Sequence, residues 1–363
     1  MTRRFRLRPL TPVHIGGKER LAPEDYVLDG NVLVRLKVSS ILSALSPELR
    51  RSFEREIDAG RLRPAQEIVG NFWRRLPPSE RPKFEQYRTR VGEGAREELR
   101  QLVARPERSG EVAALPRNPY TGDVVIPGSA IKGAIRTALV SMRVNGEAKE
   151  AFERAASNQP NKRARVLEET AFGYRSSATE SDPLRLLKVS DASWPAAAVR
   201  VDRATLHKLG NGGREDVQIY LERLECRADG VSPPECEVTI SLREEAALTP
   251  AERCLFRVLF DWDKLFLACG AFFVGRLQAE GHRFEEVRRF AGEWWPSQQE
   301  VNTGLLLRVG RYCHFDSLSV DGFREGWNAQ RREPIREIGS TRTLCETAGG
   351  KRLPFGWVLL EPV

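Results

Sequence analysis

Apolar and polar residues alternate at the start of the chain, as in a strand with one buried face. Phe5–Arg8 shows this period of two. Residues 26–28 and 32–36 are also strand-like, and the turn pair Asp29-Gly30 between them predicts a β-hairpin. Further apolar runs predict short strands at residues 124–126, 186–191, 217–224, 237–242, 305–309 and 357–360.

Helical patterns separate these strands. Residues from about 39 to 111 are highly charged, with apolar positions at helical spacing, and we interpret them as a helical insertion. A second helix is predicted from Ser129 to about Val144, and a third from about Thr249 to Cys269 with Pro250 in its first turn.

This mixture predicts an α+β fold with antiparallel or mixed sheets. Strict alternation of strand and helix is absent, which argues against a doubly wound parallel sheet. At 363 residues the chain is long enough for two domains, and we place them at residues 1–195 and 196–363.

Charge adds a moderate basic surplus. The formal net charge is +8, from 58 basic and 50 acidic residues. This surplus suits contact with a polyanion, and equally suits an ordinary arginine-rich protein. No run of about 20 apolar residues predicts a membrane span, and the basic start is not followed by the apolar segment of a signal peptide.

Cysteine and histidine spacing predicts no metal site. The six cysteines are scattered without a CxxC pair, and the four histidines are distant from one another. We expect a reduced, cytoplasmic protein that uses no cofactor.

The helix predicted from Ser129 carries the most informative loop. Ser129 stands where an N-cap belongs, and Gly128 and Gly133 allow another backbone to come close. Lys132 and Arg136 are four residues apart, so both lie near the helix start. The exposed N–H groups at that end attract anions, which predicts a phosphate contact. The alternative is an ordinary solvated helix face.

A nucleotide-binding P-loop is a further possibility for this segment, and it fails. The spacing from Gly128 to Gly133 fits the pattern G-x-x-x-x-G. Ala134-Ile135 stand where Lys and Ser or Thr must follow, so the groups that hold phosphate and magnesium are missing.

Two other segments combine glycines with cations. The run His14-Ile15-Gly16-Gly17-Lys18 offers backbone N–H groups and a cation to phosphate. His14 could serve as a general base in RNA cleavage, hydrogen-bond the backbone, or stack on a base. Near the end of the chain, Gly349-Gly350-Lys351-Arg352 repeats the pattern, and Gly310-Arg311-Tyr312 adds a cation beside an aromatic ring.

Together these motifs resemble the RAMP proteins of type III CRISPR systems. The opening run 10–16 and the segment 25–30 resemble the N-terminus of such proteins, and residues 126–136 are similar to their "IPGSSIKGAIR" signature. Residues 187–191 and 351–358 resemble the next strand motif and the terminal glycine-rich loop. The order and spacing resemble most closely the terminal, fifth-named RAMP subunit of the type III-A Csm complex.

The resemblance implies two ferredoxin-like (RRM-like) domains with the helical insertion in the first. It implies a non-catalytic subunit for antiviral defence that binds the 3′ portion of the guide RNA (crRNA), caps the complex and supports 3′-end maturation of the guide. Implied partners are target RNA, the repeated backbone RAMP subunit, the small helical subunit and host nucleases that trim the guide. The expected RNA contacts are His14, Gly16, Gly17, Lys18, Gly128, Ser129, Lys132, Gly133, Arg136, Arg311, Lys351 and Arg352.

Two other functions stay open at this point. The first is a metal-independent endoribonuclease that cleaves repeat RNA with His14 as general base, as other RAMP proteins do. The second is a scaffold that binds only proteins.

Overall fold

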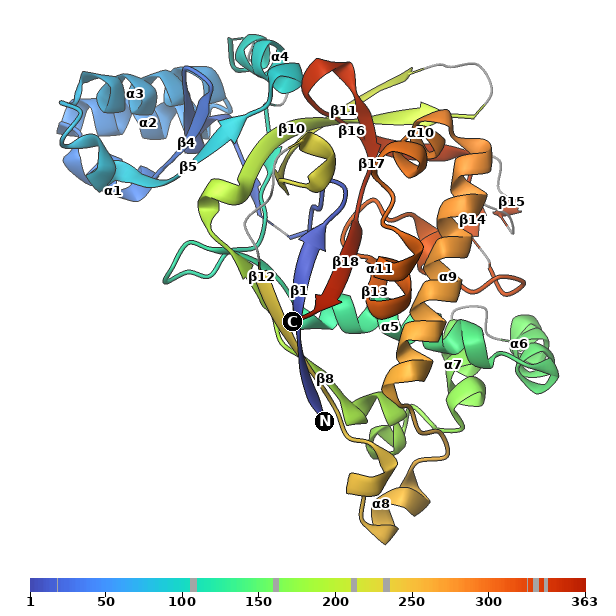
Figure 1. Cartoon of the computed structure of the whole chain (residues 1–363). Helices are drawn as coiled ribbons and strands as arrows, with labels where there is room; N and C mark the ends of the chain where they lie inside the picture. Colours follow the sequence, from blue (N-terminus) through green and yellow to red (C-terminus); the bar gives the residue numbers. More distant parts are fainter. Residues whose placement is uncertain are drawn as a thin grey trace.

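The α+β fold class is confirmed by the structure, a computed structural model (Figure 1). It describes residues 1–17, 19–104, 110–158, 163–209, 214–230, 236–324, 326–328, 333–335 and 339–363. Its strands form two large sheets and two small ones.

The first large sheet is built around the N-terminal strand, β1. Its five strands lie in the order β13-β18-β1-β12-β8, and all neighbouring pairs are antiparallel. The bounds are Thr2–Pro9 for β1, Leu187–Val189 for β8, Cys236–Leu242 for β12, Leu305–Arg308 for β13 and Trp357–Pro362 for β18. Phe5 and Leu7 of β1 are buried, while Arg6 between them is exposed, as the alternation predicts.

Two helices complete this unit. Leaving aside the elements inserted between them, helix α5 (Gly128–Arg143) comes after β1 in the chain and α9 (Trp262–Arg283) comes after β12. The two helices contact each other. The path β1-α5-β8-β12-α9-β18, with sheet order β8-β12-β1-β18, is that of a ferredoxin-like fold. Strand β13 extends its edge, and Ile131, Ile135, Leu265 and Phe273 join the core.

The second large sheet has nine strands. Seven lie in the order β2-β6-β11-β10-β5-β4-β3, and β16 and β17 branch from β10. The bounds are Arg20–Leu21 (β2), Tyr26–Asp29 (β3), Val32–Leu36 (β4), Glu85–Val91 (β5), Val112–Ala113 (β6), Val199–Lys208 (β10), Arg214–Leu224 (β11), Thr341–Glu346 (β16) and Arg352–Pro354 (β17). Both large sheets contain strands from either side of residue 195, so the predicted division there is not reflected in the sheets.

The small sheets pair β7 (Val124–Ile126) with β9 (Ala192–Trp194), and β14 (Gly326–Asn328) with β15 (Glu333–Ile335). Further α-helices are α6 (Gly146–Asn158), α7 (Arg163–Phe172), α10 (Glu285–Trp294) and α11 (Gln298–Thr303). None of the described helices combines the length and apolar character that a membrane span requires.

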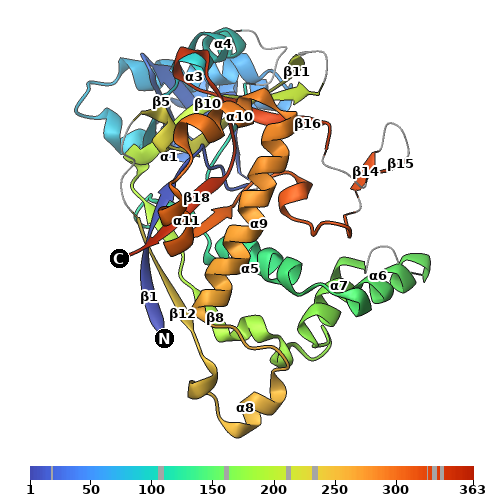
Figure 2. The same cartoon turned by 45° about the vertical axis from the view of Figure 1, so that its right-hand side comes forward.

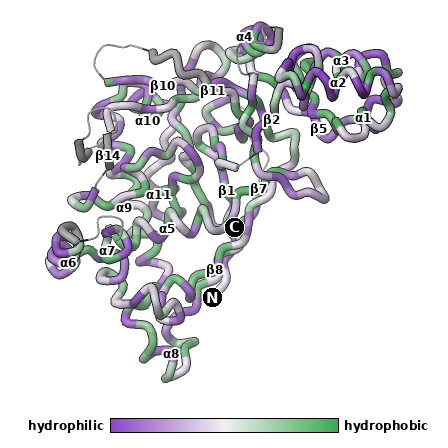
Figure 3. Tube along the Cα trace, turned by 180° about the vertical axis from the view of Figure 1, so that it is seen from behind, coloured by the Kyte–Doolittle hydropathy of each residue, from purple (hydrophilic) through white to green (hydrophobic). Residues whose placement is uncertain are grey.

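The predicted insertion is helix-rich but not wholly helical. It contains α1 (Val38–Ala44), α2 (Pro47–Asp58), α3 (Leu62–Arg75) and α4 (Glu93–Ala104). Strand β5 lies between α3 and α4 and pairs with β4 and β10, so the insertion contributes a strand to the second sheet. Hydrophilic and hydrophobic positions interleave along α2 and α3, as in amphipathic helices (Figure 3).

The helix predicted from Thr249 to Cys269 is wrong in one respect: it is two helices. Thr249 does cap α8 (Pro250–Leu255), and its side chain and that of Glu252 satisfy each other's backbone N–H groups. Asp261 then caps the separate helix α9 by accepting from the N–H of Lys264 at 2.8 Å. The second cap starts a new helix axis, which runs on to Arg283.

Candidate nucleic-acid interface

Two of the four glycine-and-cation segments, 14–18 and 310–312, meet in the structure. The N–H of Arg311 donates to the carbonyl oxygen of His14 at 2.8 Å. Gly310 has φ +92°, and a Cβ there would lie 2.5 Å from the same oxygen. A Cβ on Gly16 would lie 3.3 Å from Cδ of Arg311. Only glycine fits at position 310, and the contact places the exposed Gly16, Gly17 and Arg311 on one surface.

His14 supports this surface from below. Its side chain is fully buried, and Nδ1–H donates to the carbonyl oxygen of Glu222 at 2.7 Å. Its ring stacks near that of Tyr312, with 6.2 Å between centroids. Burial lowers the pKa of His14 to about 4, so the imidazole is neutral at pH 7. In contrast to the sequence-based predictions, it has no exposed atom to offer RNA, either as a contact or as a general base.

The carboxylate of Glu222 fixes the neighbouring chain segments. It is fully buried, and it accepts from the N–H of Leu115 at 3.0 Å, from Nη2 of Arg117 at 3.0 Å and from the hydroxyl of Thr89 at 3.3 Å. These partners satisfy a charge that would otherwise be costly to bury. Sequence reasoning missed this residue, although a glutamate at an inward position of a strand was a signal to examine.

The loop after Gly310 has an unusual backbone. Tyr312 and His314 have φ values of +67° and +58°, which only surrounding contacts can maintain. The ring of Tyr312 packs on Phe355 at 5.2 Å, and Nε2 of His314 accepts from the N–H of Thr343 at 3.1 Å. The loop therefore holds Arg311 in place from both sides.

The loop that opens α5 is used differently from the prediction. The N-cap is Pro127, not Ser129, and the helix begins at Gly128. The N–H of Gly128 donates to Oδ1 of Asp191 at 2.7 Å, so a carboxylate of the protein already occupies this end of the helix. A Cβ on Gly128 would lie 2.3 Å from the carbonyl oxygen of Val189, so glycine is needed for close packing.

The two cations of α5 also have partners inside the protein. Nζ of Lys132 donates to the carbonyl oxygen of Leu187 at 2.8 Å, and burial lowers its pKa. Arg136 forms ion pairs with Glu168, at 2.8 Å, and Asp182. These contacts join α5 to β8 and α7. RNA contact by Lys132 and Arg136 stays a prediction. Because both side chains have partners inside the protein, less of their positive charge is available to RNA than the sequence suggests. On this helix Ser129 and Gly133 are the exposed positions of the predicted set.

The segment 349–352 packs against α10. Nζ of Lys351 lies 5.7 Å from the ring centroid of Trp294, and Arg352 lies 3.8 Å from Glu286 and 3.9 Å from Glu346. Lys351 is exposed. The remaining predicted contact, Lys18, lies outside the described residues.

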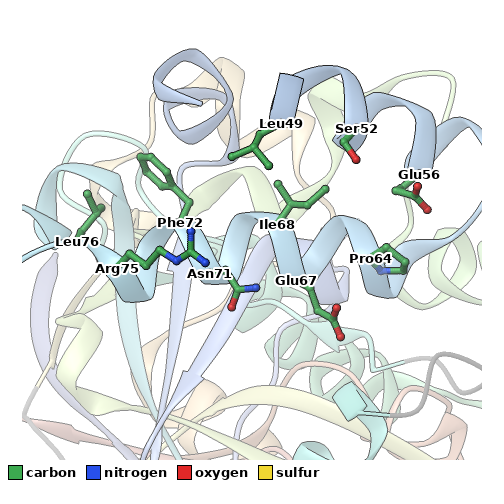
Figure 4. A pocket seen from close by; sticks show the side chains of 10 residues that line it. All are labelled: Leu49, Ser52, Glu56, Pro64, Glu67, Ile68, Asn71, Phe72, Arg75 and Leu76. Carbon is green, nitrogen blue, oxygen red and sulfur yellow. The ribbon is translucent and has the colours of Figure 1, made fainter. Parts of the chain in front are cut away.

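The insertion contains a pocket of about 450 Å³ between α2 and α3 (Figure 4). Leu49, Ile68 and Phe72 give it an apolar wall, and Glu56 and Glu67 add carboxylates. Arg75 adds one cation, so the lining carries more carboxylates than cations and does not favour phosphate. Among the described residues no group of three or more His, Cys, Asp or Glu side chains is placed to hold a metal ion.

Comparison with known proteins identifies the family to which the chain belongs. The model of the RAMP superfamily matches residues 6–249, about two thirds of the chain. The chain belongs to the RAMP superfamily. This confirms the resemblance drawn from the motifs at the level of the superfamily, and the matched range contains the His14 loop and the start of α5. No curated protein sequence matches the chain significantly.

Two solved structures share the fold over nearly the full length of the chain. One chain of a cryo-EM structure of a Csm-crRNA-target RNA ternary complex of a type III-A CRISPR-Cas system is 21% identical, with a TM-score of 0.69. The match covers 99% of this chain and 100% of that one. The crystal structure of T. onnurineus Csm5 is 18% identical, with a TM-score of 0.63, and 98% and 99% of the two chains are covered.

The two glycines of α5 give a matched test of packing against RNA contact. Gly128→Ala should lower the free energy of unfolding by about 1–3 kcal/mol or more, because its Cβ meets backbone atoms. A Cβ on Gly133 meets nothing within 4 Å, so Gly133→Ala should raise stability by about 0.5–1 kcal/mol. Chemical denaturation measures both. If Gly133→Ala is more stable yet binds RNA less well, Gly133 contacts RNA; unchanged binding would contradict that role.

Burial of His14 should make stability depend on pH. Its folded pKa, about 4, lies below the ordinary value of 6.5, so the neutral form is favoured in the folded state. The stabilisation is present above pH 6.5 and is lost as the pH falls towards 4, by at most about 3 kcal/mol. His14→Asn keeps an N–H donor for Glu222 and does not titrate. We expect denaturation midpoints of the variant to change less between pH 6.5 and 4; parallel curves for both proteins would contradict the assignment.

Proposed function

We propose that this RAMP protein is a guide-RNA-binding subunit of a type III-A (Csm) effector complex. The observation that carries the proposal is the junction of the His14 and Arg311 loops. It places the exposed Gly16 and Gly17 beside the exposed Arg311, and the two loops are anchored by the packing of Tyr312 on Phe355 and by the hydrogen bond from His14 to the carbonyl oxygen of Glu222. Such a surface suits the phosphates of an RNA backbone.

The similarity in fold supports the choice of complex. The two solved structures described above are a Csm5 protein and a chain of a complex that contains Csm, crRNA and target RNA, and both align over nearly the whole of this chain. We propose that this chain likewise binds crRNA and assembles with other Csm subunits, chiefly the repeated backbone RAMP subunit and the small helical subunit, in the cytoplasm.

The finer role is part of the same proposal. We place the chain at the end of the complex that holds the 3′ portion of the guide, where it caps the assembly and supports 3′-end maturation in antiviral defence. Trimming is then done by recruited host nucleases. The chain itself is non-catalytic in this proposal, which the burial of His14 supports, since a general base must reach its substrate.

Arg311 provides the direct test of RNA binding. Arg311→Ala should weaken guide binding about equally for all sequences and reduce the slope of affinity against salt concentration by about one. The variant is compared with Arg55→Ala, whose side chain is 70% exposed on the insertion. Filter binding or anisotropy at several salt concentrations measures both. Equal affinity and slope for Arg311→Ala and the unmodified protein would argue against this surface.

A cleavage assay tests the non-catalytic assignment. The purified protein, incubated with repeat RNA in EDTA, should leave the RNA intact. Site-specific cleavage that disappears in His14→Ala would replace the proposal with the metal-independent endoribonuclease.

A further inference from the structure

Helix α9 has apolar residues both on the side that packs against the rest of the protein and on its exposed side. No polar side chain occurs between Leu265 and Gly275, eleven consecutive residues. A helix that is apolar all round is normally buried on all sides. The inner side of α9 packs against α5, α10 and β13, with Leu265, Phe273 and Leu277 buried. Its outer side remains exposed, and Figures 1 and 2 show α9 running along the side of the molecule.

The outer face forms a continuous groove. Two adjoining hollows of about 560 Å³ and 300 Å³ share Val274 and Gln278 in their walls. Leu267 projects from this face with 66% of its surface exposed. Among the exposed large apolar residues of the described chain, only Tyr120 and Met1 have a larger exposed fraction. Residues 263, 267, 271, 274, 278 and 282 follow one another at spacings of three or four, so they form one stripe along the helix. Leu267, Ala271 and Val274 form the apolar centre of this stripe, and Asp263, Gln278 and His282 are polar positions towards its ends. An exposed apolar centre with a polar rim marks an interaction site.

The shape and chemistry of the groove select a helix as its occupant. A strand or loop laid on this face would bury its own N–H and C=O groups without partners, because α9 uses its backbone groups internally. A helix satisfies its own backbone. Gly270, Ala271 and Gly275 lack bulk, which allows a second helix to approach closely. From Asp263 to His282 the stripe is roughly 28 Å long, the length of a helix of about 19 residues.

The charges at the two ends of the groove define the partner further. Asp263 lines one end, and His282 and Arg288 line the other. No residue that lines the groove between these two ends is a cation, which disfavours an RNA backbone. We infer that the outer face of α9 is a docking surface for an amphipathic helix of a partner protein. That helix carries an apolar stripe, an acidic residue beside His282 and Arg288, and a basic residue beside Asp263.

This docking surface is independent of the proposed RNA surface. Its residues lie on α9, α10 and the segment around α11, and none belongs to the His14 or Arg311 loops. A protein that fails to bind RNA could still bind its partner here, and the reverse also holds.

Photo-crosslinking in the assembled complex tests the inference. The full chain with Ala271→p-benzoylphenylalanine is expressed in cells, the complex is purified through a tag on this chain, and it is then irradiated. We expect a crosslink to a helical segment of a different protein in the purified complex, with an acidic residue towards the His282 end. Crosslinks only to RNA, only to a second copy of this chain, or to nothing would overturn the inference.

A matched pair of leucines gives the second measurement. Leu267→Glu should lower the ratio of the crosslinked protein to this chain in the purified complex at least about tenfold, because a charge would face the apolar stripe. Leu318 is 63% exposed and lies outside the groove, so Leu318→Glu should leave the ratio unchanged. Thermal denaturation and co-purifying RNA should be the same for both variants. Equal ratios for the two variants would overturn the inference, whatever the RNA content.

Discussion

The arrangement of the candidate interface depends on one buried carboxylate. Glu222 lies on β11, inside the protein, where a charge without partners would cost several kcal/mol. Its side chain is satisfied by two segments that are distant in sequence: β5, through Thr89, and the stretch 115–117, through Leu115 and Arg117. Its backbone carbonyl accepts from His14. The second sheet and the loop beneath the proposed RNA surface therefore have to form together.

Buried ion pairs also change the meaning of the basic composition. Arg223 is fully buried between Asp202 and Asp229, and Arg308 and Arg342 both bind Glu280 in the interior. Much of the arginine content thus holds the fold together. The net charge of the chain remains positive, but a count of arginines overstates the number of guanidiniums available to RNA.

The sequence predicted local features well, because they depend on neighbouring residues. The alternation in β1, the hairpin at Asp29-Gly30 and the cap at Thr249 all reappear in the structure. The RAMP resemblance supplied the ferredoxin-like fold. What sequence reasoning could not supply are contacts between distant segments.

The errors in the predicted site residues arise from such contacts between distant segments. Asp191 at the start of α5, Leu187 beside Lys132 and Glu222 beneath His14 all come from segments far along the chain. A pattern of glycines and cations is the same whether its partner is a phosphate or a carboxylate of the protein. Strand β5 was missed because it is flanked by helices and is anchored by pairing rather than by a strong local pattern.

The position of β1 has a consequence for synthesis of the chain. The first strand is central in its sheet, and its two neighbours are β12 and β18, the second of which ends one residue before the C-terminus. A nascent chain therefore carries β1, a strand with one apolar face, with an open edge until β18 emerges from the ribosome. The ferredoxin-like unit closes only once β18 has been synthesised, so a chain that stops before β18 exposes that edge to other molecules.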